Sequence, residues 1–525
     1  MDRRALLTTA VALTTAWTTA ACSRGDGGAT GAGGTTTAPA RTPTSARTPA
    51  RPAGPADWAA LARGLDGKLI RPSDADYASA RQLYNTRFDG QRPAAVAYVA
   101  GEDDVKECLA YAKAHAVPVS IRNGGHSYGG WSSGNDRLVI DVSSLDRIDA
   151  DGVIGAGAKL VDVYRVLARR GRTIPAGSCP TVGVSGLTLG GGHGVTSRAY
   201  GLTCDSLTEA TIVTADGRTL TASATENRDL FWALRGGGNG NFGVVTGFRF
   251  RTHPAPPTVT AYLTWPWSRA AAVIAAWQRW GPAQPDEIWS SLHLAAGPGG
   301  VRPTLSVAAF TLGSESDLRN ALDRLADAVG SPASSSALRP RSYLDAMLAY
   351  AGCLSLTEDQ CRLPGTTPGR SKQGALPRET YAAASDFFDR GLAPAGVQAL
   401  IAAAEAFTHI PAARGGGGSI ALTALGGAVN RVDPLATSFV HRRSRMLAQY
   451  IAAWRPGTSG SAQQSWLRDA HASMRRYASG AAYQNYPDPT LRDWRRAYYG
   501  LAADRLTRLK RQYDPDRLFA QPQGL

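Results

Sequence analysis

Three glycine-rich segments constrain what this chain can fold into more than any other feature of its sequence. They cover residues 122–130, 179–194 and 235–245, and each lies beside short stretches with strand or helix patterns. Glycine lets a backbone come close to a ligand, and successive N–H groups in a tight turn can bind a pyrophosphate. The sequence therefore predicts a ligand held by loops, with His126 inside the first of them.

The third segment contains the spacing GxGxxG at residues 238–243, which also occurs in dinucleotide-binding folds. In those folds the motif follows a strand and opens a helix. Here it follows a predicted helix over 227–234 and opens a predicted strand over 244–250, which is the reverse order. Residues 155–157 (Gly-Ala-Gly) have the correct surroundings, but Leu160 stands where the third glycine is needed. The sequence therefore argues against that type of dinucleotide site.

Length and charge exclude several classes of protein. The chain has 525 residues, of which 43% are hydrophobic, so it can form a sizeable core and about three domains. The formal net charge is +15, but only six of the 57 basic residues are lysines, and the arginines are scattered. No nucleic-acid partner is expected, because a dense basic run is missing. Neither CxxC nor HExxH occurs, so no metal site is expected.

The first 22 residues are typical of an export signal. Arg3 and Arg4 precede a mildly apolar stretch over 5–21, and Cys22 follows small residues. This pattern predicts a twin-arginine signal that ends at a lipoprotein cleavage site, with Cys22 as the lipidated N-terminus. An ordinary signal peptide with an unrelated cysteine is the alternative. Residues 23–56, rich in Gly, Thr, Ala and Pro, are expected to form a flexible linker.

The apolar pattern beyond residue 57 predicts an α+β protein. Short strands and helices alternate as far as residue 250, and a strand, a long helix, two strands and another helix follow. The second pattern is typical of an antiparallel sheet with helices on one face. The predicted strands include 118–122, 138–142, 153–156, 207–214, 219–223, 244–250 and 258–264, the predicted helices 102–116, 159–170, 227–234, 270–280 and 315–329, and the predicted loops 364–369 and 414–419.

The glycine-rich segments and several downstream motifs together resemble one known family. Residues 426–431 (GGAVNR) lead to His-Arg at 441–442, and residues 483–488 (YQNYPD) lead to Tyr-Tyr-Gly at 498–500. From about residue 91 to the C-terminus, the chain is similar to FAD-linked oxidases of the vanillyl-alcohol oxidase and p-cresol methylhydroxylase type, in their berberine-bridge-enzyme-like branch. The resemblance implies an FAD-binding domain over 57–254 and 486–525, and a substrate domain with a helix-covered antiparallel sheet over 255–485.

The resemblance also implies that FAD is held by two covalent bonds. His126 matches the histidine bonded to the flavin 8α methyl group, and Cys179 matches the cysteine bonded to flavin C6. The alternatives are a loop histidine that only forms hydrogen bonds and a buried structural thiol. The other positions expected to bind the cofactor are Arg122, Asn123, Gly124, Gly125, Ser127, Tyr128, Gly129, Val182, Gly183, Gly186, Gly190, Gly191, His193, Gly243, Val245 and Asn485.

Catalysis is expected to involve Tyr483, which matches the family's candidate base. Such a base takes the proton of a substrate hydroxyl while hydride leaves the same carbon. Tyr486 is the second candidate base, and a core tyrosine bonded to the backbone is the alternative for Tyr483. Gln449 matches a polar position that faces the substrate in this family. Its amide side chain cannot act as a base. Val182 matches the position that controls oxygen access, and its small side chain favours an oxidase. His193 is expected either to contact the flavin or to be structural.

The expected function is therefore an FAD-dependent oxidase. It would remove hydride from a CH–OH or CH–NH group of a sugar-like or natural-product substrate, with O2 reduced to H2O2. A flavin dehydrogenase with another acceptor and a non-catalytic ligand-binding lipoprotein are the alternatives. Export by the twin-arginine route would leave the protein extracellular or lipid-anchored on the outer face of the cytoplasmic membrane. In such a protein Cys353 and Cys361 are candidates for a disulfide.

Overall fold

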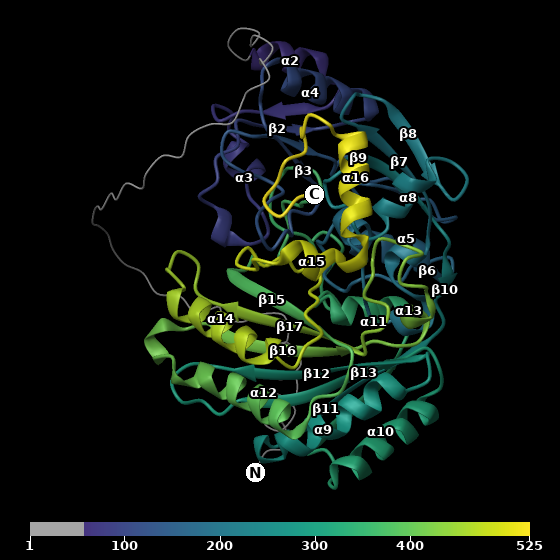
Figure 1. The fold of residues 1–525 in the computed structure, drawn as a ribbon, viewed down its shortest axis with the longest axis vertical. Helices are drawn as coiled ribbons and strands as arrows, with labels where there is room; N and C mark the ends of the chain where they lie inside the picture. Colours follow the sequence, from purple (N-terminus) through teal and green to yellow (C-terminus); the bar gives the residue numbers. More distant parts are fainter. Residues whose placement is uncertain (1–56) are drawn as a thin grey trace.

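A seven-stranded antiparallel sheet separates a layer of helices from the N-terminal part of the molecule (Figure 1). This computed structural model describes residues 57–525. The predicted export signal over 1–22 and the predicted linker over 23–56 lie outside the described residues. Within residues 57–525, no helix has both the length and the apolar character that crossing a membrane requires.

The two faces of the large sheet pack against different partners, because side chains alternate along a strand. On β13, Val307 and Ala309 pack among the covering helices, whereas Ala308 and Phe310 pack with the N-terminal core. The strand order is β14-β11-β13-β12-β16-β17-β15. The strands are β11 (Thr258–Trp265), β12 (Ile288–Ala296), β13 (Thr304–Thr311), β14 (Ser335–Arg341), β15 (Tyr381–Phe388), β16 (Gly417–Ala424) and β17 (Met446–Ala453).

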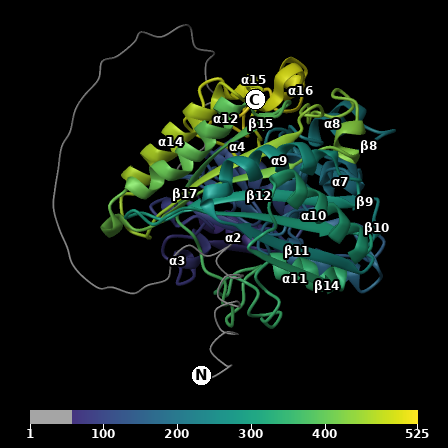
Figure 2. The ribbon, with the colours of Figure 1, turned by 90° about the horizontal axis from the view of Figure 1, so that it is seen from below.

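Four helices cover one face of this sheet (Figures 1 and 2). Trp277, Phe407 and Trp466 fill the core that the helices share with the sheet. Ser314 caps helix α10 (Glu315–Val329) by accepting a hydrogen bond from the Asp317 amide, so the start of this helix is defined locally. The four helices are α9 (Ala270–Trp280), α10 (Glu315–Val329), α12 (Pro394–Ala406) and α14 (Ser461–Arg475).

Two smaller sheets build the N-terminal part of the described chain. The first has the order β1-β2-β4-β3, with β2, β4 and β3 parallel, and the second is antiparallel with the order β5-β9-β7-β8. A short pair joins β10 to β6. The strands are β1 (Lys68–Ile70), β2 (Ala95–Tyr98), β3 (Val119–Arg122), β4 (Leu138–Asp141), β5 (Val153–Gly155), β6 (Arg172–Thr173), β7 (Leu207–Thr214), β8 (Thr219–Ser223), β9 (Gly243–Phe250) and β10 (His253–Pro254).

The C-terminal helices return to this N-terminal part (Figure 1). Lys510 on α16 is buried, pairs with Asp514 at 2.6 Å and donates a hydrogen bond to the Asn241 carbonyl at 2.7 Å. The remaining helices are α2 (Trp58–Gly64), α3 (Tyr77–Ala80), α4 (Glu102–Ala114), α5 (Leu160–Ala168), α6 (Val184–Leu189), α7 (Ser197–Tyr200), α8 (Arg228–Leu234), α11 (Tyr343–Tyr350), α13 (Ala428–Arg431), α15 (Trp494–Tyr499) and α16 (Ala503–Tyr513).

The predicted α+β fold, with a helix-covered antiparallel sheet, is confirmed. Helix α8 ends at Leu234 and β9 begins at Gly243, so the GxGxxG spacing lies between a helix and a strand, as expected. The candidate disulfide between Cys353 and Cys361 is present. The loop predicted over 414–419 is shorter than expected, because β16 begins at Gly417 and pairs with both β12 and β17.

Candidate functional site

The first glycine-rich segment leaves the sheet at the end of β3. There the Arg122 guanidinium is buried and forms an ion pair with Asp141 on the neighbouring β4. It also donates a hydrogen bond to the Ala80 carbonyl at 2.7 Å. The Arg122 side chain therefore fixes the strand from which the loop starts, and the Ser127 hydroxyl, which accepts a hydrogen bond from the Trp131 amide at 3.2 Å, shapes the far end of the loop.

The first and second glycine-rich segments meet backbone to backbone. A Cβ atom on Gly124 would lie 2.5 Å from the Gly183 amide nitrogen and 2.5 Å from the Thr181 carbonyl oxygen, so only glycine fits there. At the same junction, His126 Nε2 lies 2.8 Å from Thr181 Oγ1. Cys179 comes two residues before Thr181 in the sequence. The structure therefore brings both predicted attachment residues to the junction of the two loops.

The His126 imidazole is held in a neutral state. Its ring stacks on Tyr84 with 4.0 Å between ring centroids. Burial, helped by the nearby Lys159 ammonium, lowers the pKa of His126 to about 3. The imidazole is therefore neutral at neutral pH, and one of its ring nitrogens carries a lone pair.

The Cys179 thiol is free and exposed, although protein atoms surround much of it. Its partial burial, together with the charge of Glu379, raises the pKa of Cys179 to about 11. The thiol is therefore protonated at neutral pH. Burial also raises the pKa of Glu379 to about 7, and a hydrogen bond with Tyr84 opposes that rise.

Lys159 supports the loop junction from beneath. Its ammonium is buried and donates hydrogen bonds to Ser143 Oγ at 3.0 Å, to the Gly157 carbonyl at 2.8 Å and to Asn123 Oδ1. Burial lowers the pKa of Lys159 to about 8. A small cavity beside the loop is lined by Gly124, Lys159 and Arg370, among others.

Tyr84, Glu379 and Lys159 were missed by sequence reasoning. Tyr84 and Glu379 reach the site through a β-bridge that joins Asn85 to Glu379, two residues far apart in the sequence. No local pattern marks such a contact. Lys159 could have been noticed, because it follows the glycine pair at 155–157 at the start of a helix.

Tyr483 lies under the second glycine-rich segment. Its hydroxyl oxygen accepts a hydrogen bond from the Gly192 amide at 2.8 Å and another from Asn485 Nδ2 at 2.9 Å. Burial has the largest effect and raises the pKa of Tyr483; the hydrogen bonds that its oxygen accepts from Gly192 and Asn485 stabilise the tyrosinate and oppose this rise only in part.

A chain of polar contacts joins the glycine-rich segments to the large sheet. His193 Nε2 lies 2.8 Å from the Tyr486 hydroxyl, and the Tyr486 ring stacks on Tyr128 with 5.2 Å between centroids. Gln449, on β17, donates a hydrogen bond to the Tyr128 hydroxyl at 2.7 Å. All four side chains were predicted from the sequence, and the structure brings them together with Tyr483, whose ring centroid lies 4.9 Å from that of Tyr486.

Some of the other predicted cofactor-binding positions pack under the glycine-rich loop, and others lie away from the loop junction. A Cβ on Gly190 would meet the side chains of Asn485 and Asn239, and one on Gly191 would meet Phe439, so both glycines allow close packing under the loop. Away from the loop junction, Gly243 and Val245 lie in β9 and pair with β7. Four predicted positions remain. Gly125 has a φ of +68°, and a Cβ on Gly129 would meet Trp131. Val182 packs against the N-terminal core, and a Cβ on Gly186 would meet nothing within 4 Å.

The residues around these loops fit a polar, doubly phosphorylated cofactor. Buried polar atoms normally have hydrogen-bond partners, yet six in or near the glycine-rich segments have none within the described protein. The cations beside Gly124 suit a diphosphate. The residues 57–525 contain no group of three or more His, Cys, Asp or Glu side chains that could hold a metal ion. The six unpartnered atoms are Arg122 Nη1, Thr188 Oγ1, His193 Nδ1, Arg235 Nε, Asn239 Oδ1 and Gln484 Oε1.

Comparisons with known proteins agree with this geometry. Residues 93–223 match the family model of an FAD binding domain, and residues 482–525 match the model described as berberine and berberine like. The uncharacterized FAD-linked oxidoreductase YgaK of Bacillus subtilis is 32% identical over 470 residues, which cover 88% of this chain and 97% of the relative. A xylooligosaccharide oxidase of Thermothelomyces thermophilus is 30% identical, with 82% and 87% of the two chains covered.

A solved structure extends the likeness to the whole described fold. The berberine-bridge-enzyme-like protein 1 of Physcomitrella patens superposes with a TM-score of 0.78 at 30% identity, over 88% of this chain and 97% of that one. Fold and matched domains together define an FAD-linked oxidoreductase. Within that class, the chain belongs to the berberine-bridge-enzyme-like family, which confirms the resemblance inferred from the motifs.

The loop contact at Gly124 should decide whether FAD is retained. Gly124→Ala would force the two loops apart, because its Cβ would meet backbone atoms that cannot move independently. We expect the variant to retain little FAD and to lose about 1–3 kcal/mol of stability, as overpacked sites do. The measurement is flavin absorbance per protein, together with thermal unfolding. Gly247→Ala is the matched control, because its Cβ would meet nothing within 4 Å; equal flavin content in both variants would contradict the prediction.

Proposed function

We propose that this protein is an oxidase that holds FAD through bonds to His126 and Cys179. It removes hydride from a CH–OH or CH–NH group of a sugar-like or natural-product substrate, and O2 is the final acceptor, giving H2O2. The observation that carries the proposal is the junction of the two loops, where His126 contacts Thr181 two residues after Cys179. Bound FAD would supply the acceptor for the hydride.

The attachment residues are suited to different parts of the flavin ring. The neutral His126 imidazole has a lone pair available for bond formation, and Tyr84 holds the ring in place by stacking. Cys179 must lose its proton before its sulfur can form a bond, because its thiol is protonated at neutral pH. Its exposure leaves the sulfur accessible for that reaction.

In this proposal, Tyr483 takes the substrate proton. The hydrogen bonds from Gly192 and Asn485 fix the position of its oxygen and stabilise the tyrosinate. Burial has the larger effect and raises the pKa of Tyr483, so the phenol must first lose its proton before it can accept one from the substrate. Gln449 has no ionisable group, so it can orient a substrate hydroxyl but cannot take its proton. Through Tyr128, Gln449 links the sheet to the loop that carries His126.

The comparisons support an oxidase acting on a carbohydrate-like alcohol. Relatives include the xylooligosaccharide oxidase and a chitooligosaccharide oxidase of Gibberella zeae, 29% identical over 84% of this chain. The small side chain of Val182 also favours oxygen access, as argued from the sequence. For cell location, the sequence of residues 1–22 supports export by the twin-arginine route with a lipid on Cys22, and the disulfide between Cys353 and Cys361 suits an oxidising compartment.

Peroxide release tests the oxidase proposal. Oligosaccharides, monosaccharides and aromatic alcohols should be offered under air to the purified protein, with release of H2O2 as the readout. We expect peroxide from at least one carbohydrate. If a substrate reduces the flavin anaerobically, but the flavin is reoxidised only by an added quinone and not by air, the result would instead support the dehydrogenase alternative.

His126→Ala should leave FAD attached by one bond. The flavin should still migrate with denatured protein through Cys179, and His126→Ala/Cys179→Ala should release it completely on denaturation. The measurement is flavin fluorescence on a denaturing gel, with intact mass as a second readout. Flavin that leaves the unaltered protein on denaturation would contradict covalent attachment.

Tyr483→Phe removes the proposed proton acceptor but keeps the aromatic ring in the core. The rate of flavin reduction by substrate should fall about 10²–10⁴-fold, the usual contribution of a positioned base. The measurement is anaerobic stopped-flow reduction. Tyr486→Phe is the matched control, and a larger loss in that variant would transfer the role to Tyr486.

A further inference from the structure

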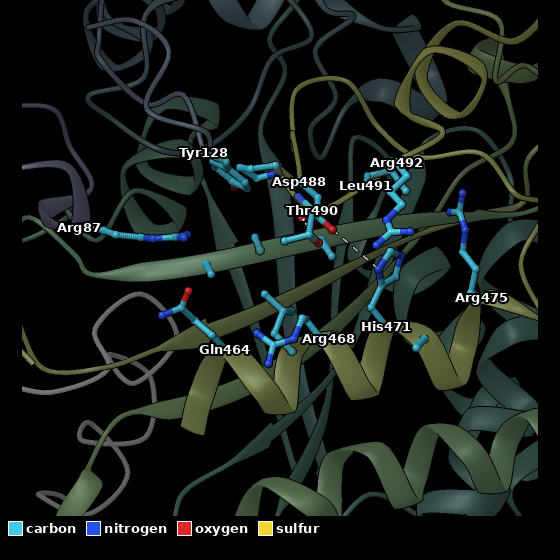
Figure 3. A pocket seen from close by; sticks show the side chains of 16 residues that line it. Arg87, Tyr128, Gln464, Arg468, His471, Arg475, Asp488, Thr490, Leu491 and Arg492 are labelled. Atoms are coloured by element: carbon cyan, nitrogen blue, oxygen red, sulfur yellow. Dashed lines mark hydrogen bonds and ion pairs between the residues drawn. The ribbon is translucent and has the colours of Figure 1, made fainter. Parts of the chain in front are cut away.

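A cavity of about 470 Å³ opens at the free edge of β15. Helix α14 forms one wall and the loop after Tyr486 forms another, as Figure 3 shows. Ala382, Ala383 and Ala384 of β15 form the strand side of the cavity, and Tyr128 closes part of it. Small alanine side chains at the edge strand leave this space open.

The lining of the cavity is strongly cationic. Four arginines line it, against a single carboxylate, Asp488. Among residues 57–525, one of these arginines is ion-paired, since Arg475 binds Asp386 at 2.6 Å. The other three form no ion pair with a carboxylate of the described chain. The three are Arg87, Arg468 and Arg492, and Figure 3 shows them on different sides of the cavity.

The acidic groups near the cavity are already engaged within the protein. Asp488 Oδ1 accepts hydrogen bonds from the Thr490 amide at 2.8 Å and from the Thr490 hydroxyl at 2.7 Å. Its other oxygen, Oδ2, lies 3.9 Å from His471 Nδ1. Asp386 is fully buried behind Arg475 and lies 3.2 Å from His471 Nε2. The charge that the cavity leaves without a partner is therefore positive.

The cavity adjoins the candidate catalytic residues through one shared side chain, Tyr128. Tyr128 lines it and also contacts Gln449 and Tyr486. The wall residues Asp488 and Arg492 follow Tyr486 directly along the chain. A ligand group in the cavity can therefore belong to a molecule that also reaches the candidate site.

We propose that this cavity binds a carboxylate of the substrate, so that the protein acts on acidic carbohydrates such as oligomers of uronic acids. The proposal rests on the oxidase function proposed above. Arginine suits this role because its planar guanidinium can form two parallel hydrogen bonds with one carboxylate. A bound carboxylate would supply the opposite charge that no ion pair of the described chain gives to these three arginines.

The first test compares digalacturonate with its fully methyl-esterified form, which lacks the negative charges and carries one extra methyl group on each carboxyl. We expect kcat/KM for digalacturonate to exceed that for the ester by about tenfold or more, the effect of a charge-assisted hydrogen bond. The excess should shrink as salt rises, because salt screens exposed charges. Equal values for the two substrates, with peroxide from both, would overturn the carboxylate proposal and leave the oxidase function standing.

The second test removes the exposed arginines. Arg468→Gln and Arg492→Gln should each raise KM for digalacturonate severalfold, the double variant by about tenfold or more, with little change in kcat. The values for the ester should not change. Arg476→Gln is the matched control, because Arg476 lies at the end of the same helix, is exposed and does not line the cavity. An equal rise in KM for the control, or for the ester, would contradict the proposal.

Calorimetric binding without turnover separates the two proposals. Digalacturonate should bind the unaltered holoenzyme under anaerobic conditions and bind the Arg468→Gln/Arg492→Gln variant about tenfold more weakly. Arginine-dependent binding without any peroxide would support the cavity and contradict the oxidase function. Binding of inorganic sulfate or phosphate that digalacturonate does not displace would show a site for small free anions and overturn the carboxylate proposal.

Discussion

The backbone contact between Gly124 and Gly183 is the constraint on which the candidate site depends. The first loop leaves a mixed sheet after β3, whereas the second precedes α6, so two separate elements must meet at one point. Any side chain at Gly124 would separate them and change the position of His126 relative to Cys179. The buried ion pair of Arg122 with Asp141 and the buried Lys159 ammonium fix the two sides of this contact.

Most helices and strands could be predicted because their apolar residues follow the period of their own element. Helix α10 and strands β7 and β8 have the expected bounds for this reason. The start of β16 could not be predicted, because Gly417 and Gly418 favour a loop locally. Pairing with β12 and β17 overrides that preference. Strand β15 shows no alternation because all of its residues are buried.

The site divides in the same way. Residues carried by a motif, such as His126, Cys179 and Tyr483, could be predicted from the sequence, because each motif fixes several neighbours at once. Tyr84 and Glu379 could not, since they meet only after the N-terminal part and the large sheet have packed. The arginines of the cavity were hidden for another reason. In a chain with many scattered arginines, three that line one cavity without forming ion pairs cannot be recognised until their positions in space are known.

In the two proposals above, recognition of charge and proton transfer fall to different residues of one short stretch of the chain. Tyr483 and Tyr486 lie under the glycine-rich segments, and the same stretch continues past Pro487 and Pro489 to the cavity wall. Proline fixes φ, so this connection is stiff. A substrate group held in the cavity would therefore be bound by the same short stretch of backbone that carries Tyr483. Substitutions among the exposed cavity arginines can then change which substrates bind while the Gly192 and Asn485 hydrogen bonds keep Tyr483 in place.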